Sequence, residues 1–409
     1  MEWKEVRLGD IVSIKSGLAY KGAFIGKGEN ILLGMGCVSF KDKFLFSGAR
    51  PYEADCDDKY CVEPGDIVLA TRQQSDNLPI LAMPAIIPSS LKAKKIIYGT
   101  NLYKVENHSE VTNDFLFWQL KMPDYIDYIS SVKTGSVVRM VTKKNIEDYV
   151  FRCPPKEVRD RISKLLWGLD RKIELNNKIN ADLEEMAQAI FKNWFVDFEL
   201  FKDSKFVDSE LGMIPEGWKV GRLGDFCKCL LGGTPSRSKE EYWNGDVNWI
   251  NSGEINKFRI LEASEKITEL GLSKSATKLL PKKTTVLAIT GATLGQVSLL
   301  EIDTCANQSV IGVLENAEVP YEYIYPFIKD RIEMLIQHQT GGAQQHINKD
   351  NVESLIFLLP AKNVLENYIS LVGPMYKRIE SQCFENLYLS TLRDTLLPRL
   401  MSGELEVPE

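Results

Sequence analysis

The 409-residue sequence has few of the residues that build metal centres and disulfide frameworks. It contains only three histidines, and its eight cysteines are scattered without a Cys-x-x-Cys pair, so we expect reduced thiols and no structural zinc site. No apolar run approaches the roughly 18 residues that a membrane span requires. The first residues, MEWKEVRLGD, are charged from the second position, which is unlike a signal peptide. We therefore expect a cytoplasmic protein.

Motifs of several enzyme classes are also missing. The sequence has no GxxxxGK[ST] loop for ATP, no GxSxG elbow and no convincing nuclease carboxylate cluster. The only adjacent prolines, in CPPK at Cys153, do not form the (N/D/S)PP(Y/F) pocket that a self-contained adenine methyltransferase needs for its extruded base. A net charge of -6 excludes a globally basic nucleic-acid binder, so any contact with phosphate would need local basic patches. The sequence gives no reason to expect an enzyme.

What the sequence does contain is a long internal repeat. WKEVRLGD at Trp3 is matched by WKVGRLGD at Trp218, with six of eight positions identical at an offset of 215. A second stretch, beginning at Thr134, is matched from Thr340 at an offset of 206. A repeat of this length indicates a duplicated domain and not a solenoid. Each copy is a well-matched frame around a divergent interior, and the second interior is nine residues shorter.

The matched tail of each copy has the spacing of a coiled-coil helix. Mostly apolar positions alternate at intervals of four and three from Ile162 and again from Tyr368. Ordinary bundle helices are the alternative, but the length and the sustained spacing favour a paired coil. Gly168 and Pro374 are expected to divide each tail into a short helix and a long one. The predicted seam contains Leu166, Leu169, Ile173, Asn180, Leu183 and Ile190 in the first tail, and Met375, Ile379, Asn386, Leu389 and Leu396 in the second.

Polar residues interrupt this seam in both tails, at Asn176, Asn180, Gln382 and Asn386. Buried polar residues can fix helix register at some cost in stability. Replacing Asn180 and Asn386 by leucine should then raise the melting temperature while loosening the register.

Aromatic residues crowd the end of the first tail. They are more than a two-helix seam requires, and aromatic residues are enriched at protein interfaces. Packing against the neighbouring globular domain is the simpler explanation, and we favour it over a partner interface. The residues are Phe191, Trp194, Phe195, Phe198 and Phe201.

The two interiors contain β-rich stretches such as PGDIVLATR at Pro64 and TTVLAITGATLGQVSLL at Thr284. The predicted fold is α+β, with two globular α/β domains separated by two long antiparallel coiled-coil helices in a pseudo-twofold tandem duplication. A helix of about 30 residues is roughly 45 Å long, comparable to one DNA turn of ~34 Å. In the second copy, the segment LGMIPEGWK leads into the repeat that begins at Trp218. The first copy has no such lead-in segment of its own, and we expect the C-terminal LLPRLMSGELEV to take its place in space. The expected boundaries are 1–154 for the first domain, 155–200 for the first helix, 201–359 for the linker and second domain, and 360–409 for the second helix and tail.

Three long strings resemble the specificity subunit of type I restriction-modification systems: LDRKIELNNKINADLEEMAQAIFKNWFVDFE at Leu169, LGMIPEGWKVGRLGD at Leu211 and LRDTLLPRLMSGELEV at Leu392. The resemblance covers both framing regions and both helices. It implies that the interiors are two target-recognition domains, each reading one part of a bipartite, asymmetric double-stranded DNA target. It also implies that the chain binds no cofactor and has no catalysis of its own.

The resemblance implies particular partners. Two modification subunits would methylate adenine N6 with S-adenosylmethionine, and restriction (helicase-nuclease) subunits would cleave DNA with ATP and magnesium. We expect the modification subunits to dock on the exposed flanks of both helices. The negative net charge favours an alternative, a coiled-coil scaffold whose two heads bind proteins or glycans, unless basic residues gather on the same face of both heads.

Candidate DNA contacts come from side chains that reach base edges or hold phosphates, in loops at equivalent places of the two copies. Solvated polar loops are the alternative for each. Replacing Arg139 or Gln345 by alanine should weaken specific DNA binding by the assembled methyltransferase in a salt-controlled titration. The first-copy candidates are Arg72, Gln73, Gln74, Asn77, Lys133, Arg139, Lys143 and Lys144. The second-copy candidates are Arg237, Lys239, Thr290, Thr293, Gln296, Gln344, Gln345, His346 and Lys349.

Overall fold

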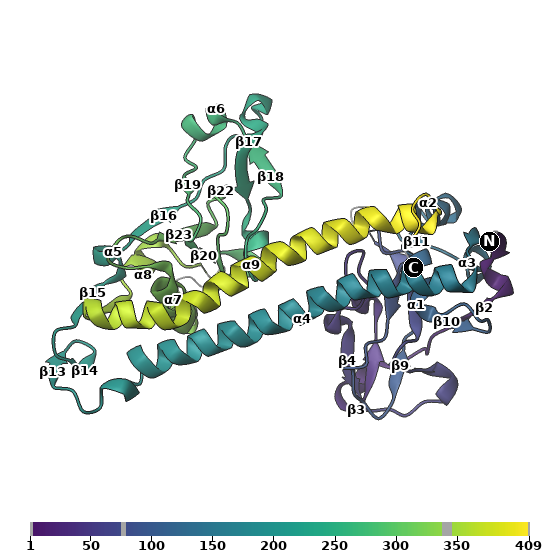
Figure 1. Ribbon diagram of the computed structural model, residues 1–409, viewed down its shortest axis with the longest axis horizontal. Coiled ribbons are helices and arrows are strands. Elements are labelled where there is room, and N and C mark those ends of the chain that lie inside the picture. Colours follow the sequence, from purple (N-terminus) through teal and green to yellow (C-terminus); the bar gives the residue numbers. More distant parts are fainter. Residues whose placement is uncertain (1–2, 75–78, 338–345, 408–409) are drawn as a thin grey trace. The chain divides into compact units, whose positions relative to one another are not determined.

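The computed structural model describes residues 3–74, 79–337 and 346–407, and the chain divides into two compact units. The first unit is Met1–Lys172 with Leu389–Glu409, and the second is Ile173–Tyr388. Both divisions fall inside long helices, α4 (Lys156–Phe195) and α9 (Lys362–Met401), so each unit contains one end of each helix (Figure 1).

A two-stranded antiparallel sheet in each unit carries the repeat that opens both copies. Lys4 lies opposite Cys153 in the first unit, and Lys219 lies opposite Leu359 in the second. These partners are related by the same offsets, 215 and 206, that relate the two copies in the sequence. The predicted duplication is therefore confirmed down to the strand register. The strands are β1 (Lys4–Arg7), β12 (Val150–Cys153), β15 (Lys219–Arg222) and β24 (Ile356–Leu359).

The divergent interiors share one topology, with two four-stranded sheets in each unit. The first sheet is antiparallel in both units, in the orders β2-β10-β6-β8 and β16-β23-β20-β21. The second sheet has the orders β4-β3-β9-β5 and β18-β17-β22-β19, and its central pair is parallel in both units. The strands of the first unit are β2 (Val12–Ser16), β3 (Ile25–Leu33), β4 (Ala49–Tyr52), β5 (Cys61–Val62), β6 (Ile67–Ala70), β8 (Pro84–Ile86), β9 (Ile96–Tyr98) and β10 (Leu102–Asn107). Those of the second are β16 (Lys228–Leu231), β17 (Trp243–Ile250), β18 (Glu265–Ile267), β19 (Leu279–Leu280), β20 (Thr285–Ala288), β21 (Val297–Leu299), β22 (Thr304–Ala306) and β23 (Val310–Leu314).

The segments IVLA and TVLA form strands that are buried on both faces. In β6, Ile67 and Leu69 pack into one core cluster while Val68 and Ala70 pack into another. Successive side chains of a strand point to opposite faces, so an uninterrupted apolar run is what a strand between two cores requires. Strand β20 divides its side chains between two clusters in the same way.

None of the helices within the described ranges is long and apolar enough to cross a membrane.

Shorter elements complete the two units. The first unit adds β7 (Arg72–Gln73), α1 (Asn113–Gln119), α2 (Pro123–Val132), β11 (Arg139–Met140) and α3 (Lys143–Glu147). The second adds β13 (Phe206–Ser209), β14 (Gly212–Pro215), α5 (Leu223–Phe226), α6 (Glu269–Ser273), α7 (Tyr321–Gln337) and α8 (Lys349–Glu353).

The helices α4 and α9 are continuous over 40 residues each, so the predicted breaks at Gly168 and Pro374 are wrong. Both residues lie on exposed faces. A glycine in a helix costs only about 1 kcal/mol relative to alanine. A proline removes one backbone hydrogen bond, but the fully buried Val372 and the buried Tyr376 hold α9 in its core on either side. Packing therefore outweighs the local preference.

Within each unit the two helices run antiparallel. In the second unit, Asn176 and Asn180 of α4 contact Gln382 and Cys383 of α9, whereas the later Phe195 contacts the earlier Tyr368. In the first unit, the earlier part of α4 shares a core cluster with the last turns of α9. These contacts agree with the predicted antiparallel coil.

The predicted seam residues are buried to different degrees. Leu166, Asn180 and Ile379 are buried, while Leu169, Ile173, Leu183, Ile190, Met375, Asn386, Leu389 and Leu396 are half-buried. Along α4 the buried positions next to Leu183 and Ile190 are Glu184 and Phe191, one residue later, while Ala187 between them is fully buried. A straight helix has 3.6 residues per turn, so its buried face drifts relative to a strict 3.5-residue pattern.

The aromatic end of α4 lies in the core of the second unit, as predicted. Phe191 and Phe195 are buried against Tyr323 and Tyr368. Phe198 and Phe201 both lie against Trp218. These rings therefore belong to the intramolecular core.

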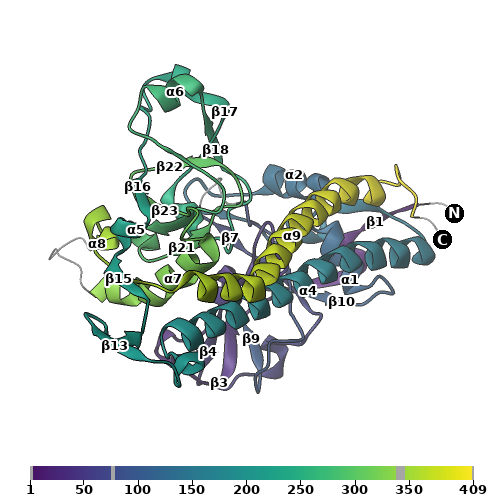
Figure 2. The same ribbon diagram turned by 60° about the vertical axis from the view of Figure 1, so that its left-hand side comes forward.

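The C-terminal segment completes the first unit, which confirms the predicted lead-in. Leu400 and Met401 are buried in its core, and Leu405 and Val407 pack against that core. Gly403, after α9, lies against the ring of Trp3 near the start of the chain, and Figure 2 shows the two ends of the chain side by side. In the second unit the corresponding position is taken by the β13–β14 hairpin, whose Ile214 joins the core.

Candidate nucleic-acid interface

A short strand pair joins the two predicted DNA-contact segments of the first unit. Strand β7 pairs antiparallel with β11, so that Gln73 lies opposite Arg139 and Arg72 lies opposite Met140. These segments are more than 60 residues apart in the sequence. The tertiary structure therefore brings TRQQ and KTGSVVRMVTKK side by side.

The loop that precedes β11 is closed on itself. The backbone N–H of Thr134 donates to the carbonyl of Met140, and that of Met140 donates back to Thr134, both at 2.9 Å. The Nη1 of Arg139 donates to the carbonyl oxygens of Gly135 and Ser136, the second at 3.1 Å. The side chain of Arg139 thus stabilises the conformation of its own loop.

The remaining candidates of the first unit point in different directions. Arg72, Gln74, Lys143 and Lys144 are exposed, and Lys133 is half-buried. Gln73 faces inward, where its Oε1 accepts a hydrogen bond from the backbone of Leu81 at 3.1 Å. Asn77 lies outside the described residues.

Lys143 and Lys144 occupy the first turn of the short helix α3. The hydroxyl of the N-cap residue Thr142 accepts a hydrogen bond from the backbone N–H of Asn145 at 3.1 Å, which fixes the start of the helix. Asn348 caps α8 in the same way, and Lys349 follows it. The Nζ of Lys349 forms an ion pair of 2.9 Å with Glu353.

The second unit repeats the junction between the two segments. Thr290 forms an antiparallel bridge with His346, the residue that corresponds to Met140 at the offset of 206. Thr293 is half-buried and Gln296 is exposed in the turn that follows Thr290. Gln344 and Gln345 lie outside the described residues. The same position in both copies therefore joins two polar segments.

Arg237 and Lys239 lie on a separate loop after β16. The guanidinium of Arg237 stacks on Trp243 at 3.6 Å and donates to Glu265 at 2.9 Å. The Nζ of Lys239 donates to the hydroxyl of Tyr242 at 3.0 Å. Neither contact joins these cations to the Thr290–His346 junction.

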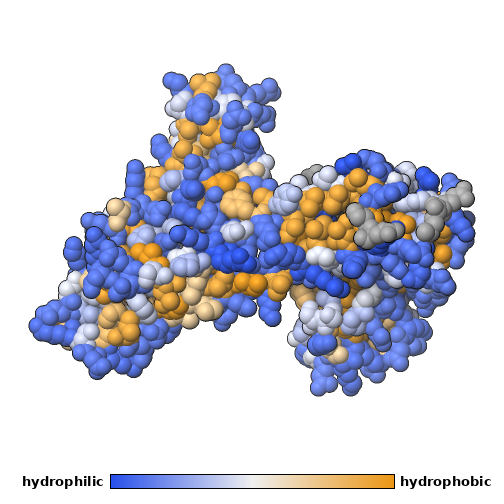
Figure 3. Space-filling model, in the orientation of Figure 1, coloured by the Kyte–Doolittle hydropathy of each residue, from blue (hydrophilic) through white to orange (hydrophobic). Residues whose placement is uncertain are grey.

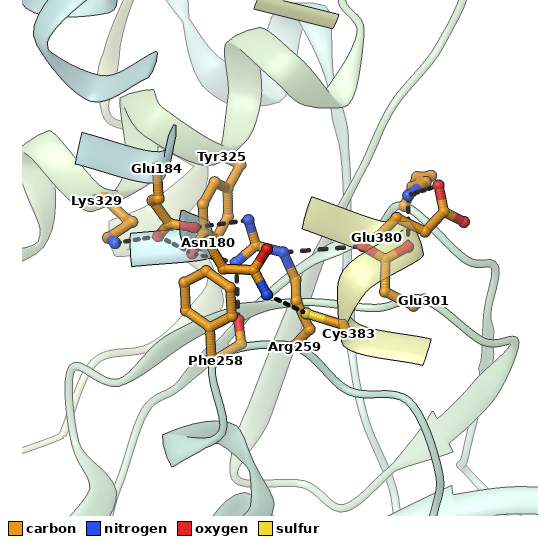
Figure 4. Close-up of polar contacts among 10 residues, drawn as sticks. Asn180, Glu184, Phe258, Arg259, Glu301, Tyr325, Lys329, Glu380 and Cys383 are labelled. Atoms are coloured by element: carbon orange, nitrogen blue, oxygen red, sulfur yellow. Dashed lines mark hydrogen bonds and ion pairs between the residues drawn. The ribbon is translucent and has the colours of Figure 1, made fainter. Parts of the chain in front are cut away.

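Periodicity did not predict a buried ion network between α4, α7 and loops of the second unit. Figure 4 shows Arg259 between the carboxylates of Glu184 and Glu301. Its Nη2 lies 2.6 Å from Glu184, and its Nε lies 3.8 Å from Glu301. Tyr325 and Lys329 also donate to Glu184, at 2.8 and 2.6 Å. Only 1% of the Arg259 side chain is exposed.

The two carboxylates of this network differ in their protonation equilibria. Burial opposes the charge of Glu184, but Arg259 and Lys329 outweigh it and lower its pKa. Burial dominates at Glu301 and raises its pKa, despite a hydrogen bond from Lys283. Lys283 also pairs with Glu380 of α9 at 3.0 Å. The network therefore connects α4 and α9 with α7 and with the loops that carry Arg259, Lys283 and Glu301.

A smaller buried ion pair connects the same two helices in the first unit. Nη1 of Arg393 in α9 lies 2.6 Å from the 3%-exposed carboxylate of Asp170 in α4. Lys43 lies 3.5 Å from the same carboxylate and above the ring of Trp167. The sequence could not reveal either network, because a charged residue beside an apolar seam normally faces solvent.

The candidate surface presents cationic and amide hydrogen-bond donors. Within residues 3–74, 79–337 and 346–407, no group of three His, Cys, Asp or Glu side chains is arranged to hold a metal ion. Exposed guanidinium, ammonium and amide groups can donate to phosphate oxygens and to base edges.

Comparison with known proteins matches residues 1–185 and 215–367 to the family of the type I restriction modification DNA specificity domain. The chain is 27% identical over 304 residues to the type I restriction enzyme MjaIX specificity subunit of Methanocaldococcus jannaschii, covering 73% of this chain and 70% of that one. It is 24% identical to the type I restriction enzyme HindI specificity subunit of Haemophilus influenzae, covering 99% of this chain and 100% of that one.

Among solved structures, the S subunit of a type I restriction-modification system from M. genitalium resembles this chain with a TM-score of 0.57. The two are 13% identical, and the likeness covers 100% of this chain and 97% of the other, which establishes a shared fold. The matched residue ranges contain the duplicated sheets and the polar junctions described above. The chain therefore belongs to the type I restriction-modification specificity family and carries two copies of its DNA specificity domain.

Proposed function

We propose that this chain is the non-catalytic specificity subunit of a type I restriction-modification complex, and that each domain reads one half of a bipartite, asymmetric DNA target. The observation that carries the proposal is the pair of equivalent junctions, β7–β11 in one copy and Thr290–His346 in the other. Both bring polar segments from distant parts of the sequence together at the same place of a DNA specificity domain. The unlike residues at these junctions favour unlike half-sites.

Catalysis would reside in other subunits. Two modification subunits would methylate adenine with S-adenosylmethionine, and restriction subunits would use ATP and magnesium to cleave DNA. This chain would supply recognition and assembly, and its side chains at the junctions would contact base edges and phosphates.

The helices would set the spacing of the half-sites and dock the modification subunits. At about 1.5 Å per residue, a helix of 40 residues is roughly 60 Å long. Within the second unit, the flanks of α4 and α9 carry exposed apolar residues. These are Leu175 and Met186 on α4, and Phe384 and Tyr388 on α9. Figure 3 shows apolar side chains gathered over parts of these helices. Such exposed apolar surface is typical of a protein interface.

Methylation mapping tests the recognition proposal. The genomes of cells that carry or lack this gene, with the modification gene present in both, are compared for N6-methyladenine. We expect methylation at one bipartite asymmetric motif only when the gene is present. Identical methylation in both strains would refute the proposal and favour the scaffold with protein- or glycan-binding heads.

Substitution at one junction tests whether each domain reads a separate half-site. Arg72→Ala should weaken the discrimination between bases at one half-site by about 1–3 kcal/mol, the value of one bidentate contact to a base. Recognition of the other half-site should not change. Lys156→Ala, an exposed cation at the start of α4, is the matched control and should preserve the motif. Equal loss at both half-sites would contradict the proposed assignment.

Co-purification tests the docking surface. Tyr388→Glu, which places a charge on the exposed flank of α9, should reduce recovery of the modification subunit. Leu270→Glu adds the same charge to an exposed apolar position of α6 and should have no effect. Equal recovery with both variants would exclude this flank.

A further inference from the structure

The loop between Thr134 and Met140 exposes apolar side chains in a basic setting. Val137 is 82% exposed, and Val138 and Met140 are 37% and 41% exposed. Single exposed apolar residues are common, but three in one short loop call for a specific explanation. Lys133 precedes the loop, and exposed Lys143 and Lys144 follow it.

The loop is held in shape before any ligand binds. Gly135 has a φ of +93°, and a Cβ at this position would lie 2.1 Å from the carbonyl oxygen of Val138. Only glycine fits this tight turn. The bridge between Thr134 and Met140 closes the base of the loop, and Arg139 ties its side chain to two loop carbonyls. A braced loop loses less conformational entropy on binding.

We propose that Val137 is a specificity-determining residue that contacts the 5-methyl group of a thymine in the major groove of one half-site. This inference rests on the proposed function, because it assumes that the first domain reads DNA. Apolar side chains recognise thymine through this methyl group, which no other DNA base carries.

The shape of the loop favours the major groove. Val137 lies in the loop that the Thr134–Met140 bridge closes, two residues before the β7–β11 strand pair, and the major groove, about 12 Å wide, admits a two-stranded element of this kind. The minor groove is only about 6 Å wide. Residues that wedge between base pairs there are usually longer or stiffer than valine. The lysines around the loop base suit the phosphates that border the groove.

The experiment uses the full chain assembled with its modification subunits and duplexes that contain the mapped target. Each thymine of the target is replaced in turn by uracil, which lacks only the 5-methyl group, and affinity is measured at fixed salt. We expect one replacement to weaken binding about fourfold, the effect of one methyl group removed from water. Val137→Ala should weaken binding to the parent duplex and abolish the difference between thymine and uracil at that position.

Val150→Ala is the matched control, because Val150 is 51% exposed in the same unit but lies on β12. It should retain the wild-type preference for thymine. Equal affinity for every uracil duplex, or a thymine preference that survives in Val137→Ala, would overturn the inference while leaving the proposed function intact. Loss of stacking next to the loop, detected with 2-aminopurine in the duplex, would also overturn it in favour of a wedge. Absence of any sequence-specific binding would refute the proposed function as well.

Discussion

Replacing Arg259 by methionine should strongly destabilise the second unit. The substitution keeps much of the side-chain volume but leaves the carboxylates of Glu184 and Glu301 without their shared guanidinium. Removing one partner of a buried ion pair costs about 3–5 kcal/mol, because the remaining charge is left uncompensated. The cation–π contact with Tyr325 at 4.8 Å is lost as well.

Thermal unfolding followed by calorimetry provides the measurement. For a unit of roughly 200 residues, each kcal/mol changes the melting temperature by about 2–4 °C, so we expect a decrease of about 10 °C. Hydrogen exchange of peptides from residues 173–388 assigns the change to the second unit. Arg237→Met is the matched control, since Arg237 is ion-paired with Glu265 in the same unit but remains 55% exposed. Its effect should stay below about 1 kcal/mol.

Two further outcomes test the reasoning. The double variant Arg259→Met with Glu184→Met should be more stable than Arg259→Met alone, because apolar replacement of both partners removes the buried charge. Glu184 has a lowered pKa in the wild type and would lose the main cause of that shift in the variant. Protonation of Glu184 should therefore reduce the defect of Arg259→Met as the pH falls from 7 toward 5. A decrease of less than about 3 °C, or a double variant no better than the single one, would refute the explanation.

The remaining predictions concern the helix pair, acid stability and thiol reactivity. Asn180→Leu should raise the melting temperature, because Asn180 makes only a weak contact of 3.5 Å with Cys383 and its Oδ1 has no partner. Asn386→Leu should lower the melting temperature, because it removes the 2.9 Å hydrogen bond that Asn176 donates to Asn386. Equal effects of the two substitutions in calorimetric scans would contradict this. Because burial raises the pKa of Glu301, its charge opposes folding at neutral pH, and we expect the free energy of unfolding of the wild type to rise as the pH falls from 7 toward 5. Glu301→Gln should reduce this rise in denaturant titrations. Burial raises the pKa of the Cys37 thiol to about 12, so a thiol reagent at pH 8 should modify it only as fast as the first unit opens, and rapid labelling of the native protein would contradict its burial.

The opposite effects expected for Asn180→Leu and Asn386→Leu show how the structure changes a sequence-based prediction. Both positions interrupt the seam in the same pattern, so the sequence predicts the same outcome for both substitutions. The side-chain hydrogen bonds differ, because Asn386 takes part in a chain of contacts with Asn176 and Asn177. Partner identity, and not periodicity, determines the energetic role of a buried amide.

Sequence alone determined the duplication, the antiparallel helices and the family. Two offsets related the copies, and the paired strands beginning at Lys4 and Lys219 reproduce those offsets residue by residue. Long helices with regular apolar spacing leave a strong periodic signal, and the family match follows the same framing segments.

Only the tertiary structure decided which polar segments meet and which charges are buried. The pairing of Arg72 with Met140, the inward turn of Gln73 and the burial of Arg259 depend on contacts between residues far apart in the chain. The continuity of α9 through Pro374 has the same origin, because packing on either side outweighs a local preference. Local sequence patterns report which face of an element is apolar, whereas long-range packing selects the partners of that face.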